Sequence, residues 1–222
     1  MLLAVDTSTR WIGLALYDGS QVIAEVAWQS RNNHTIELAP AVAGLLKRSG
    51  INPGSLSVLA VALGPGSFTS LRIGLGLVKG MALALHLPIL GVPTLDILAA
   101  SQPVQEWPLA AILQAGRGRI ALGWYMEKEG AWCAHEDARV TTVEELSQSI
   151  HKPTLICGEL TAEERHLLAR KRKNAMLASP ASSVRRPAFL AELAWQRWQA
   201  GQVDDPVTLS PVYLHIAEAI PG

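Results

Sequence analysis

The sequence contains few of the residues from which metal centres and disulfide frameworks are built. Only two of its 222 residues are cysteines, Cys133 and Cys157, and they are too far apart in the sequence for a metal knuckle. So few cysteines are typical of a chain that stays reduced in the cytosol. The six histidines never form an HxxxH or HxH pair, which excludes a helical two-histidine metal site. We therefore expect no zinc or iron enzyme and assign no metal ligand.

The chain also lacks an excess of either charge and a segment that would direct it out of the cell. Nineteen basic and nineteen acidic residues give a formal net charge of zero, so no global field attracts nucleic acid or anionic lipid. The apolar start at residues 1–5 is ended by Asp6 and is too short for the apolar core of a signal peptide. We expect a cytoplasmic protein that does not act at a membrane.

No arrangement of a nucleophile with a base and an acid is apparent, so we assign no catalytic residue. Paired carboxylates occur at residues 144–145, 163–164 and 204–205, in polar turns or first helical turns, where exposed charges are the ordinary expectation. The one dense basic run, residues 170–173, is typical of a solvated helix C-terminus, and contact with RNA is the alternative.

Residues 58–87, around which the chain is organised, have the pattern of a strand, a turn and a helix. Residues 58–63 are continuously apolar, which is typical of a strand that is buried on both faces. Gly64, Gly66 and Ser67 then form a turn whose uncovered backbone N–H groups can hold an anion. The lysine of a P-loop is missing, and a tight turn without a ligand is the alternative interpretation.

The helix predicted after this turn, capped by Thr69 or Ser70, is too apolar to be covered on one side alone. Its three interior glycines cost roughly 1 kcal/mol each relative to alanine, and burial of most of its large apolar residues is needed to offset that cost. Gly76, Gly80 and Ala84 form a smooth stripe at four-residue spacing, where another helix can approach closely. We expect burial on two sides, against the sheet and against either a neighbouring helix or a partner.

The beginning of the chain predicts a strand, a polar turn and a β-hairpin. Residues 2–5 form the strand, and the turn that follows contains Asp6, Thr7, Ser8 and Thr9. This order of elements resembles the first phosphate loop of the actin, hexokinase and Hsp70 superfamily, which makes the turn a candidate nucleotide or anion loop. The alternative is that its polar side chains only satisfy backbone groups of the turn.

The second half of the chain repeats the order of elements predicted for the first half. Three predicted strands, at residues 109–113, 119–125 and 132–140, precede a helix that Thr142 caps. A further strand precedes a helix that Thr161 caps, and each cap has a glutamate three residues later. The sequence therefore predicts two related α/β lobes, residues 1–103 and a smaller one at residues 104–222. The last helix, residues 187–201, is amphipathic and is a candidate to pack back on the first lobe.

Four motifs are specific enough to compare with known families. They are DTST at residues 6–9, His34 at the start of the first helix, GPGSFTSLRIGLGLVKG at residues 64–80 and PxYL at residues 211–214. Together they span the chain, and they resemble the bacterial TsaB family, formerly called YeaZ. The resemblance implies an actin-like (ASKHA, ribonuclease H-like) α/β fold of two lobes with the second reduced. It also implies a non-catalytic role in tRNA threonylcarbamoyladenosine (t6A) synthesis.

The same resemblance implies the partners. Members of the family pair with the catalytic paralogue TsaD, which attaches the threonylcarbamoyl group to the adenosine 3′ of the anticodon in tRNAs reading codons that start with A. A TsaE-type ATPase and a threonylcarbamoyl-adenylate synthase would complete the machinery. tRNA would reach the chain only through the complex, and the chain alone would be a homodimer. No cofactor is expected, although weak binding of ATP or ADP, alone or at the TsaD interface, is left open.

The resemblance places the partner surface on the helices that begin at His34 and Ser70. We assign to this surface His34, Leu38, Leu45, Leu71, Gly76, Gly80 and Ala84. The candidate nucleotide or anion loops contain Asp6, Thr7, Ser8, Thr9, Gly64, Gly66 and Ser67. TsaD-type proteins carry two metal-binding histidines where this chain has Thr94 and Leu98, which agrees with the histidine count.

The sequence departs from the family pattern at three positions. Ser70 replaces a glycine, Gln114 stands where aspartate is frequent, and His215 stands where arginine commonly closes the tail motif. Two other functions remain as alternatives. One is an actin-superfamily ATPase or kinase that uses Asp6, which is disfavoured because the second lobe offers only Gly158 in place of a glycine-rich loop. The other is a degenerate glycoprotease-like metalloenzyme, which is disfavoured by the missing histidines.

Overall fold

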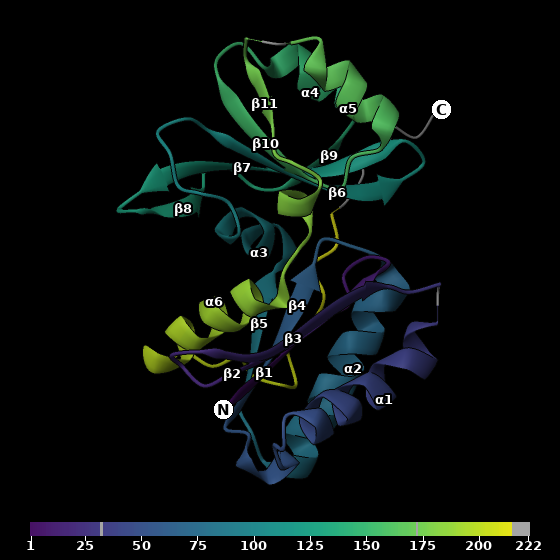
Figure 1. Cartoon of the computed structure of the whole chain (residues 1–222), viewed down its shortest axis with the longest axis vertical. Helices are drawn as coiled ribbons and strands as arrows, with labels where there is room; N and C mark the ends of the chain where they lie inside the picture. Colours follow the sequence, from purple (N-terminus) through teal and green to yellow (C-terminus); the bar gives the residue numbers. More distant parts are fainter. Residues whose placement is uncertain (32, 172, 215–222) are drawn as a thin grey trace. The chain divides into compact units, whose positions relative to one another are not determined.

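The computed structural model describes residues 1–31, 33–171 and 173–214. The chain forms two compact units (Figure 1), unit 1 with Met1–Ile97 and Arg185–Val212, and unit 2 with Leu98–Val184 and the described residues from Tyr213 on. The chain thus passes between the units three times. The sequence suggested a boundary after residue 103 and a last helix that packs back on the first lobe, and residues 187–201 do belong to unit 1. His215 lies outside the described residues.

Unit 1 is built on a five-stranded sheet. Its strands are β1 (Leu2–Asp6), β2 (Trp11–Tyr17), β3 (Val22–Gln29), β4 (Val58–Gly64) and β5 (Ile89–Pro93), in the spatial order β3-β2-β1-β4-β5. The first three pair antiparallel and include the predicted hairpin, and β4 and β5 run parallel to β1. The carboxyl ends of β1, β4 and β5 therefore lie at the same edge of the sheet.

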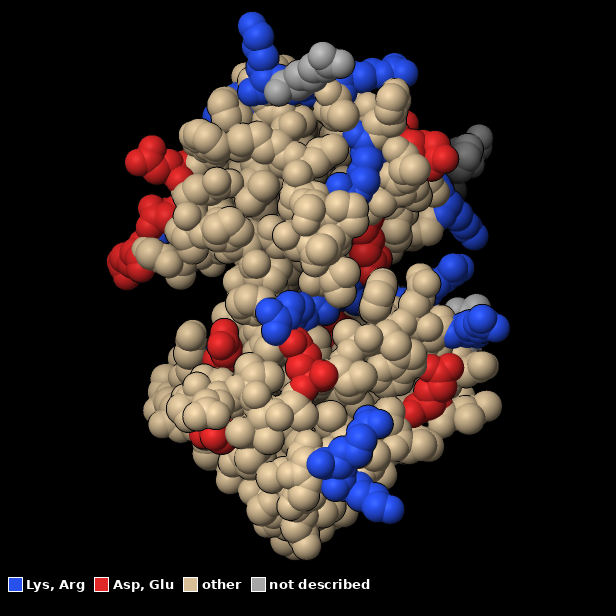
Figure 2. Space-filling view, viewed as in Figure 1, with Lys and Arg blue, Asp and Glu red and all other residues tan. Residues whose placement is uncertain are grey.

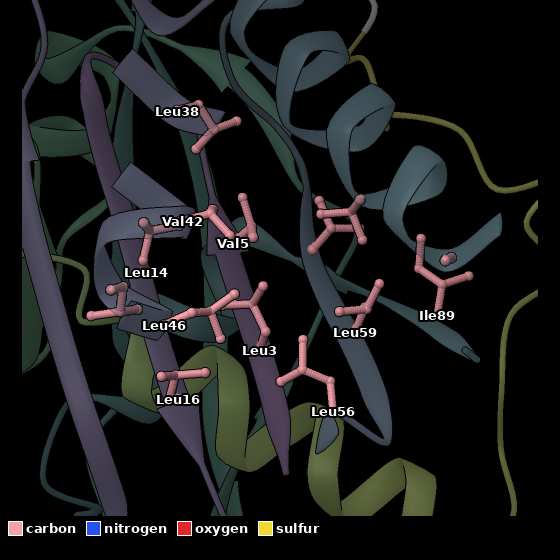
Figure 3. Close-up of a cluster of buried hydrophobic side chains, with 14 of the residues drawn as sticks. Leu3, Val5, Leu14, Leu16, Leu38, Val42, Leu46, Leu56, Leu59 and Ile89 are labelled. Atoms are coloured by element: carbon pink, nitrogen blue, oxygen red, sulfur yellow. The ribbon is translucent and has the colours of Figure 1, made fainter. Parts of the chain in front are cut away.

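Helices cover both faces of this sheet. They are α1 (His34–Arg48) and α2 (Phe68–Leu85) on one face and α6 (Pro187–Gln199) on the other, with the short α3 (Thr94–Ala100) after β5 (Figure 1). Leu3 and Val5 of β1 belong to the cluster under α1 and α2 (Figure 3), and Leu2 and Ala4 belong to the cluster under α6. Alternate side chains are thus buried on opposite faces, which confirms that the apolar runs are strands buried on both sides.

The start of α2 lies before the residues predicted to cap it. Ser67 is the cap: its backbone is extended, its hydroxyl accepts the Ser70 N–H at 3.4 Å and its carbonyl accepts the Leu71 N–H at 3.0 Å. Thr69 and Ser70 are therefore inside the helix. With 18 residues and a mean hydropathy of 1.4, α2 is long and apolar enough to span a membrane. Core helices of globular domains can be as long and as apolar, and α2 packs on the sheet of unit 1.

Unit 2 repeats the path of unit 1. Its strands are β6 (Leu109–Gly116), β7 (Arg119–Lys128), β8 (Ala131–Ala134), β9 (Arg139–Thr141), β10 (Thr154–Gly158) and β11 (Ala175–Leu177). In the order β11-β10-β6-β7-β8, the consecutive strands β6, β7 and β8 pair antiparallel, and β10 and β11 run parallel to β6. Since β1 to β5 pair in the same way, the prediction of two related α/β lobes is confirmed.

Some details of unit 2 differ from the sequence prediction. Residues 132–140, predicted as one strand, form β8 and β9, which both pair with β7, and the three-residue β11 was too short to be recognised. The helices α4 (Val143–Ser149) and α5 (Ala162–Ala169) begin at the predicted capping boxes. Short 3₁₀ turns occur at Pro53–Ser55 and Ala181–Ser183.

The two cysteines provide a test of this fold. Cys133 on β8 is exposed and Cys157 on β10 is buried, and burial raises the pKa of the Cys157 thiol because its thiolate would lose hydration. We expect a disulfide reagent such as DTNB to modify one thiol per native chain rapidly and both thiols in guanidinium chloride. Cys133→Ser should abolish the rapid reaction and Cys157→Ser should preserve it. Rapid modification of both native thiols would contradict the placement of β10.

Candidate functional site

The polar turn at residues 6–9, called here the acidic turn, is buried at the end of β1. Asp6 is 3% exposed, Thr7 and Ser8 are 0% exposed and Thr9 is 8% exposed. The turn lies at the sheet edge where β4 and β5 also end, which is where open α/β sheets usually hold their ligands. The topology thus supports this turn as the place to examine for a nucleotide or anion site.

The carboxylate of Asp6 is paired with Arg185, which precedes α6. Arg185 Nε donates to Asp6 Oδ2 at 2.9 Å and Arg185 Nη2 donates to Thr9 Oγ1 at 2.8 Å. The N–H of Ser8 donates to the other carboxylate oxygen, Asp6 Oδ1, at 2.8 Å. Arg185 is itself only 5% exposed. A carboxylate this deeply buried requires a cationic partner, because an unpaired charge in a protein interior is strongly destabilising.

Arg185 is a site residue that the sequence analysis missed. It is separated from Asp6 by 179 residues, and it is followed directly by a second arginine and by the proline that starts α6. Arg186, the neighbour, is an exposed residue that pairs with Glu25 at 2.6 Å. The two arginines are adjacent and of the same type, yet one is buried and the other is exposed. Their local sequence pattern therefore does not identify the buried one.

The hydroxyl groups of the acidic turn are also engaged within unit 1. Thr7 Oγ1 donates to the carbonyl of Ser70 at 2.8 Å, and the hydroxyls of Ser8 and Thr94 share a hydrogen bond of 2.7 Å. Thr94 Oγ1 in turn accepts the N–H of Gly64 at 3.0 Å. Side chains of the turn therefore fasten β1 to the start of α2, to the end of β4 and to α3.

The glycine corner at residues 64–67 closes on the backbone of the acidic turn. The N–H of Ser67 donates to the carbonyl of Ser8 at 2.7 Å, and a Cβ on Gly66 would overlap this same carbonyl. Gly64 has a φ of +108°, which favours glycine, and a Cβ there would crowd the carbonyl of Val212. The corner thus receives a carbonyl oxygen of its own chain at the place where the sequence suggested an anion.

The structure brings the two predicted loops together, but as they stand they do not fit a bound nucleotide. The groups expected to contact phosphate or its cation are hydrogen-bonded to other groups of unit 1. They are the carboxylate and the three hydroxyls of the acidic turn and the N–H of Ser67. This geometry agrees with the alternative interpretation of the acidic turn, in which its polar side chains form hydrogen bonds within the protein instead of binding a ligand.

The corresponding place in unit 2 is occupied in the same manner. Gln114 on β6 donates through Nε2 to the carbonyl of Glu159 at 2.9 Å and to Glu164 Oε2 at 2.8 Å. An aspartate at this position could not donate either bond, so the departure from the family pattern has a structural use. Gly158 has a φ of +124° and is packed so closely on the Ile112 carbonyl that a Cβ would overlap it.

The positions where TsaD-type proteins carry metal-binding histidines are both buried. Thr94 belongs to the network of the acidic turn, and Leu98 has an apolar side chain that is 0% exposed. Within residues 1–31, 33–171 and 173–214, no group of three histidine, cysteine, aspartate or glutamate side chains is placed to hold a metal ion.

Four residues assigned to the partner surface lie in the core of unit 1 instead. Leu38, Leu45 and Leu71 are between 0% and 4% exposed. Leu38 and Leu45 belong to the cluster under α1 and α2, and Leu71 lies beside Gly64 at the end of β4. His34 is 4% exposed, and its Nε2 forms a hydrogen bond of 3.0 Å with the carbonyl of Thr9. His34 thus orients the start of α1 against the acidic turn, and these four assignments are corrected to packing roles.

The other three assigned residues lie on the outside of α2. Gly76, Gly80 and Ala84 are exposed, and a Cβ on either glycine would meet nothing within 4 Å. They belong to a surface that we call the α1–α2 outer face, defined by the exposed residues Ile36, Ala39, Pro40, Ala43, Gly76, Gly80, Leu83 and Ala84. Leu83 is 79% exposed and Ile36 is 70% exposed. These eight residues are apolar, and the exposed cations Arg72 and Lys47 continue the two stripes at four-residue spacing.

The basic run follows the last turn of α5 in unit 2, where a solvated helix C-terminus was expected. Arg170, Lys171 and Lys173 are exposed there, and Arg172 lies outside the described residues. In the view of Figure 2, basic side chains lie at the top end of unit 2, acidic side chains lie along its sides, and wide uncharged areas separate them. Among the described side chains of this run, nothing beyond their charge favours an RNA site.

Comparison with known proteins gives a consistent family. The chain matches the family model described as "TsaD: tRNA N6-adenosine threonylcarbamoyltransferase" over residues 21–184. It is 32% identical to the "tRNA threonylcarbamoyladenosine biosynthesis protein TsaB" of Bacillus subtilis, over 98% of this chain and 95% of that protein.

Solved structures agree with the sequence matches. "YeaZ from Pseudomonas aeruginosa" superposes with a TM-score of 0.78 at 26% identity and covers 96% of this chain and 99% of its own. The ethanolamine utilization protein EutJ from Carboxydothermus hydrogenoformans, 13% identical with a TM-score of 0.52 over 86% of this chain and 88% of its own, shares the fold alone. With the repeated sheet topology, these neighbours support the actin-like α/β fold.

Two glycines of α2 form a matched pair for testing the contact between this helix and the acidic turn. A Cβ on Gly74 would overlap Thr7 Oγ1, whereas a Cβ on Gly76 would be in open space. We expect Gly74→Ala to lower the free energy of unfolding by about 1–3 kcal/mol through overpacking. Gly76→Ala should leave it unchanged or raise it by up to about 1 kcal/mol, since alanine is the better helix former. Urea unfolding measures both, and equal effects would contradict the packing.

The buried ion pair can be tested by a double-mutant cycle. Asp6→Asn or Arg185→Gln alone leaves a buried partner unpaired and should lower the free energy of unfolding by about 3–5 kcal/mol. The double variant should lose less than the sum of the two, with a coupling of about 1–3 kcal/mol in urea unfolding. The exposed pair of Arg186 and Glu25 is the control, and its coupling should stay below about 1 kcal/mol. Additive losses at Asp6 and Arg185 would show that they do not interact.

Proposed function

Because the chain belongs to the TsaB family, we propose that it is a subunit of the machinery that makes N6-threonylcarbamoyladenosine in tRNA, where it binds a TsaD-type protein and leaves catalysis to it. The modified residue would be the adenosine 3′ of the anticodon in tRNAs that read codons starting with A. A TsaE-type ATPase and a threonylcarbamoyl-adenylate synthase would supply nucleotide turnover and the activated group. In this proposal the chain acts in the cytoplasm, away from membranes.

The α1–α2 outer face is the observation that carries the proposal. An isolated exposed leucine is ordinary on a protein surface, but here Leu83 and Ile36 belong to apolar stripes of two neighbouring helices. Gly76 and Gly80 leave the backbone of α2 uncovered, so a helix of another molecule can approach it at close range. A face of this kind suits burial against protein more than contact with tRNA phosphates, which require positive charge.

The chemistry of the partner follows from the family match. The model that describes TsaD-type proteins covers residues 21–184 of this chain, which include α1 and α2. A TsaD-type partner would therefore present an equivalent pair of helices, and two such pairs can pack as a four-helix arrangement. A second copy of this chain offers the same surface, so the homodimer and the complex with TsaD would compete for it.

A bulky residue on the outer face should separate association from folding. Gly80→Leu places a side chain in open space in the free protein and disturbs no neighbour. Its Tm should stay at the wild-type value or rise by up to about 4 °C, because leucine is a better helix former than glycine. We expect it to weaken both the homodimer and the complex with the TsaD protein of the same organism at least tenfold. Light scattering on a sizing column measures the masses, and titration measures the affinity. The formation of t6A in a reconstituted mixture should fall in parallel.

Gln148→Leu is the matched control, because it adds the same side chain to an exposed position of α4 in unit 2. Its complexes should keep the wild-type mass and affinity. If Gly80→Leu binds TsaD as tightly as wild type, α2 is not the contact. If wild-type protein forms no mixed species at all and t6A synthesis does not depend on it, the scaffold function is wrong.

A further inference from the structure

The acidic turn has the chemistry of a cation site, and one cation already occupies it. Asp6 Oδ2 and Thr9 Oγ1 are hard oxygen atoms, the kind that Mg²⁺ prefers. Both face the guanidinium of Arg185, which approaches them to 2.9 and 2.8 Å. The side chains of Arg185 and Asp6 are 2% and 4% exposed, so bulk water screens this pair little.

We propose that the Arg185 guanidinium permanently takes the place of a divalent cation at the acidic turn, so that this turn anchors the chain and binds neither Mg²⁺ nor the phosphates of a nucleotide. The inference does not depend on the partner surface, which lies on other residues. It explains why the predicted nucleotide loops are closed although they have the residue types of an anion site.

Charge supports this assignment. The single negative charge of Asp6 is balanced by the single positive charge of Arg185, so an added Mg²⁺ would meet a guanidinium instead of a free carboxylate. Expelling the arginine would require its buried side chain to leave both Asp6 and Thr9. A guanidinium also suits this place better than an ammonium, because its planar fork donates from Nε and Nη2 to two separate acceptors at once.

The position of Arg185 in the chain supports it as well. Arg185 is the first residue of unit 1 after the chain has passed through unit 2, and Thr94 lies just before the chain leaves unit 1 at Ile97. Arg185 is held by Asp6 and Thr94 is held by Ser8, so one turn fixes both passages. An internal cation keeps these anchors in place at all times, which a ligand that dissociates would not do.

The proposal can be tested with Mn²⁺, which replaces Mg²⁺ and is counted by electron paramagnetic resonance. Wild-type protein and Asp6→Asn should bind the same amount of Mn²⁺. Mg²⁺ with ATP should shift the Tm of wild-type protein no more than it shifts the Tm of Asp6→Asn. Arg185→Gln exposes the carboxylate to a new cation. Saturating Mn²⁺ should raise the Tm of this variant by roughly 5 °C, or restore its folding if it is unfolded without metal. The double variant Asp6→Asn/Arg185→Gln should show no response to Mn²⁺.

Two results would overturn the proposal. One is stoichiometric binding of Mn²⁺ or Mg·ATP to wild-type protein that disappears in Asp6→Asn, because it would show that the site is open. The other is an Arg185→Gln variant that folds and whose Tm does not change with Mn²⁺. That result would show that the guanidinium does not take the place of a divalent cation. If Arg185→Gln does not fold with or without Mn²⁺, the wild-type measurement decides. Loss of TsaD binding in Gly80→Leu has no bearing on either result, so the two proposals fail separately.

Discussion

A negative charge buried at the end of a strand needs a positive charge beside it, and the architecture of unit 1 depends on how that need is met. Asp6 ends the central strand β1, and Arg185 reaches it from a segment 179 residues further along the chain. This one ion pair fixes where the chain returns to unit 1 and therefore where α6 begins to cover the second face of the sheet. The polar groups around it, from Ser8 to Thr94 and Gly64, fasten the neighbouring strands to the same turn.

The glycines of the central motif serve two distinct purposes around this turn. Gly66 admits the carbonyl of Ser8, and Gly74 admits the side chain of Thr7, so both allow α2 to lie close to the acidic turn. A Cβ on Gly76 or Gly80 would meet nothing within 4 Å, so these two glycines leave the outside of α2 smooth. A glycine-rich motif that could have served a phosphate is thus divided between internal packing and an external surface.

The two units have the same strand order, and in both the place suited to a ligand is filled by the chain itself. Arg185 fills it in unit 1, and Gln114 with its bonds to Glu159 and Glu164 fills it in unit 2. The fold of an actin-like protein is kept while the groups that would hold a nucleotide serve the fold. This geometry supports the proposal that the chain binds another subunit, because the α1–α2 outer face is exposed.

The sequence by itself determined the strands, the helices with capping boxes and the repeated α/β order, because these depend on apolar periodicity and on residues three or four positions apart. It also identified the acidic turn and the glycine corner as candidate anion loops, and the structure brought them together because the parallel strands β1 and β4 end at one edge of the sheet. It placed the cap of α2 too late and one strand over residues 132–140, since short-range patterns do not define element ends sharply. It assigned Leu38, Leu45 and Leu71 to a surface because a helical stripe does not reveal whether it faces a sheet or a partner. Only the tertiary structure decided that, and only the tertiary structure joined Arg185 to Asp6, because an ion pair between residues so far apart leaves no trace in the local sequence.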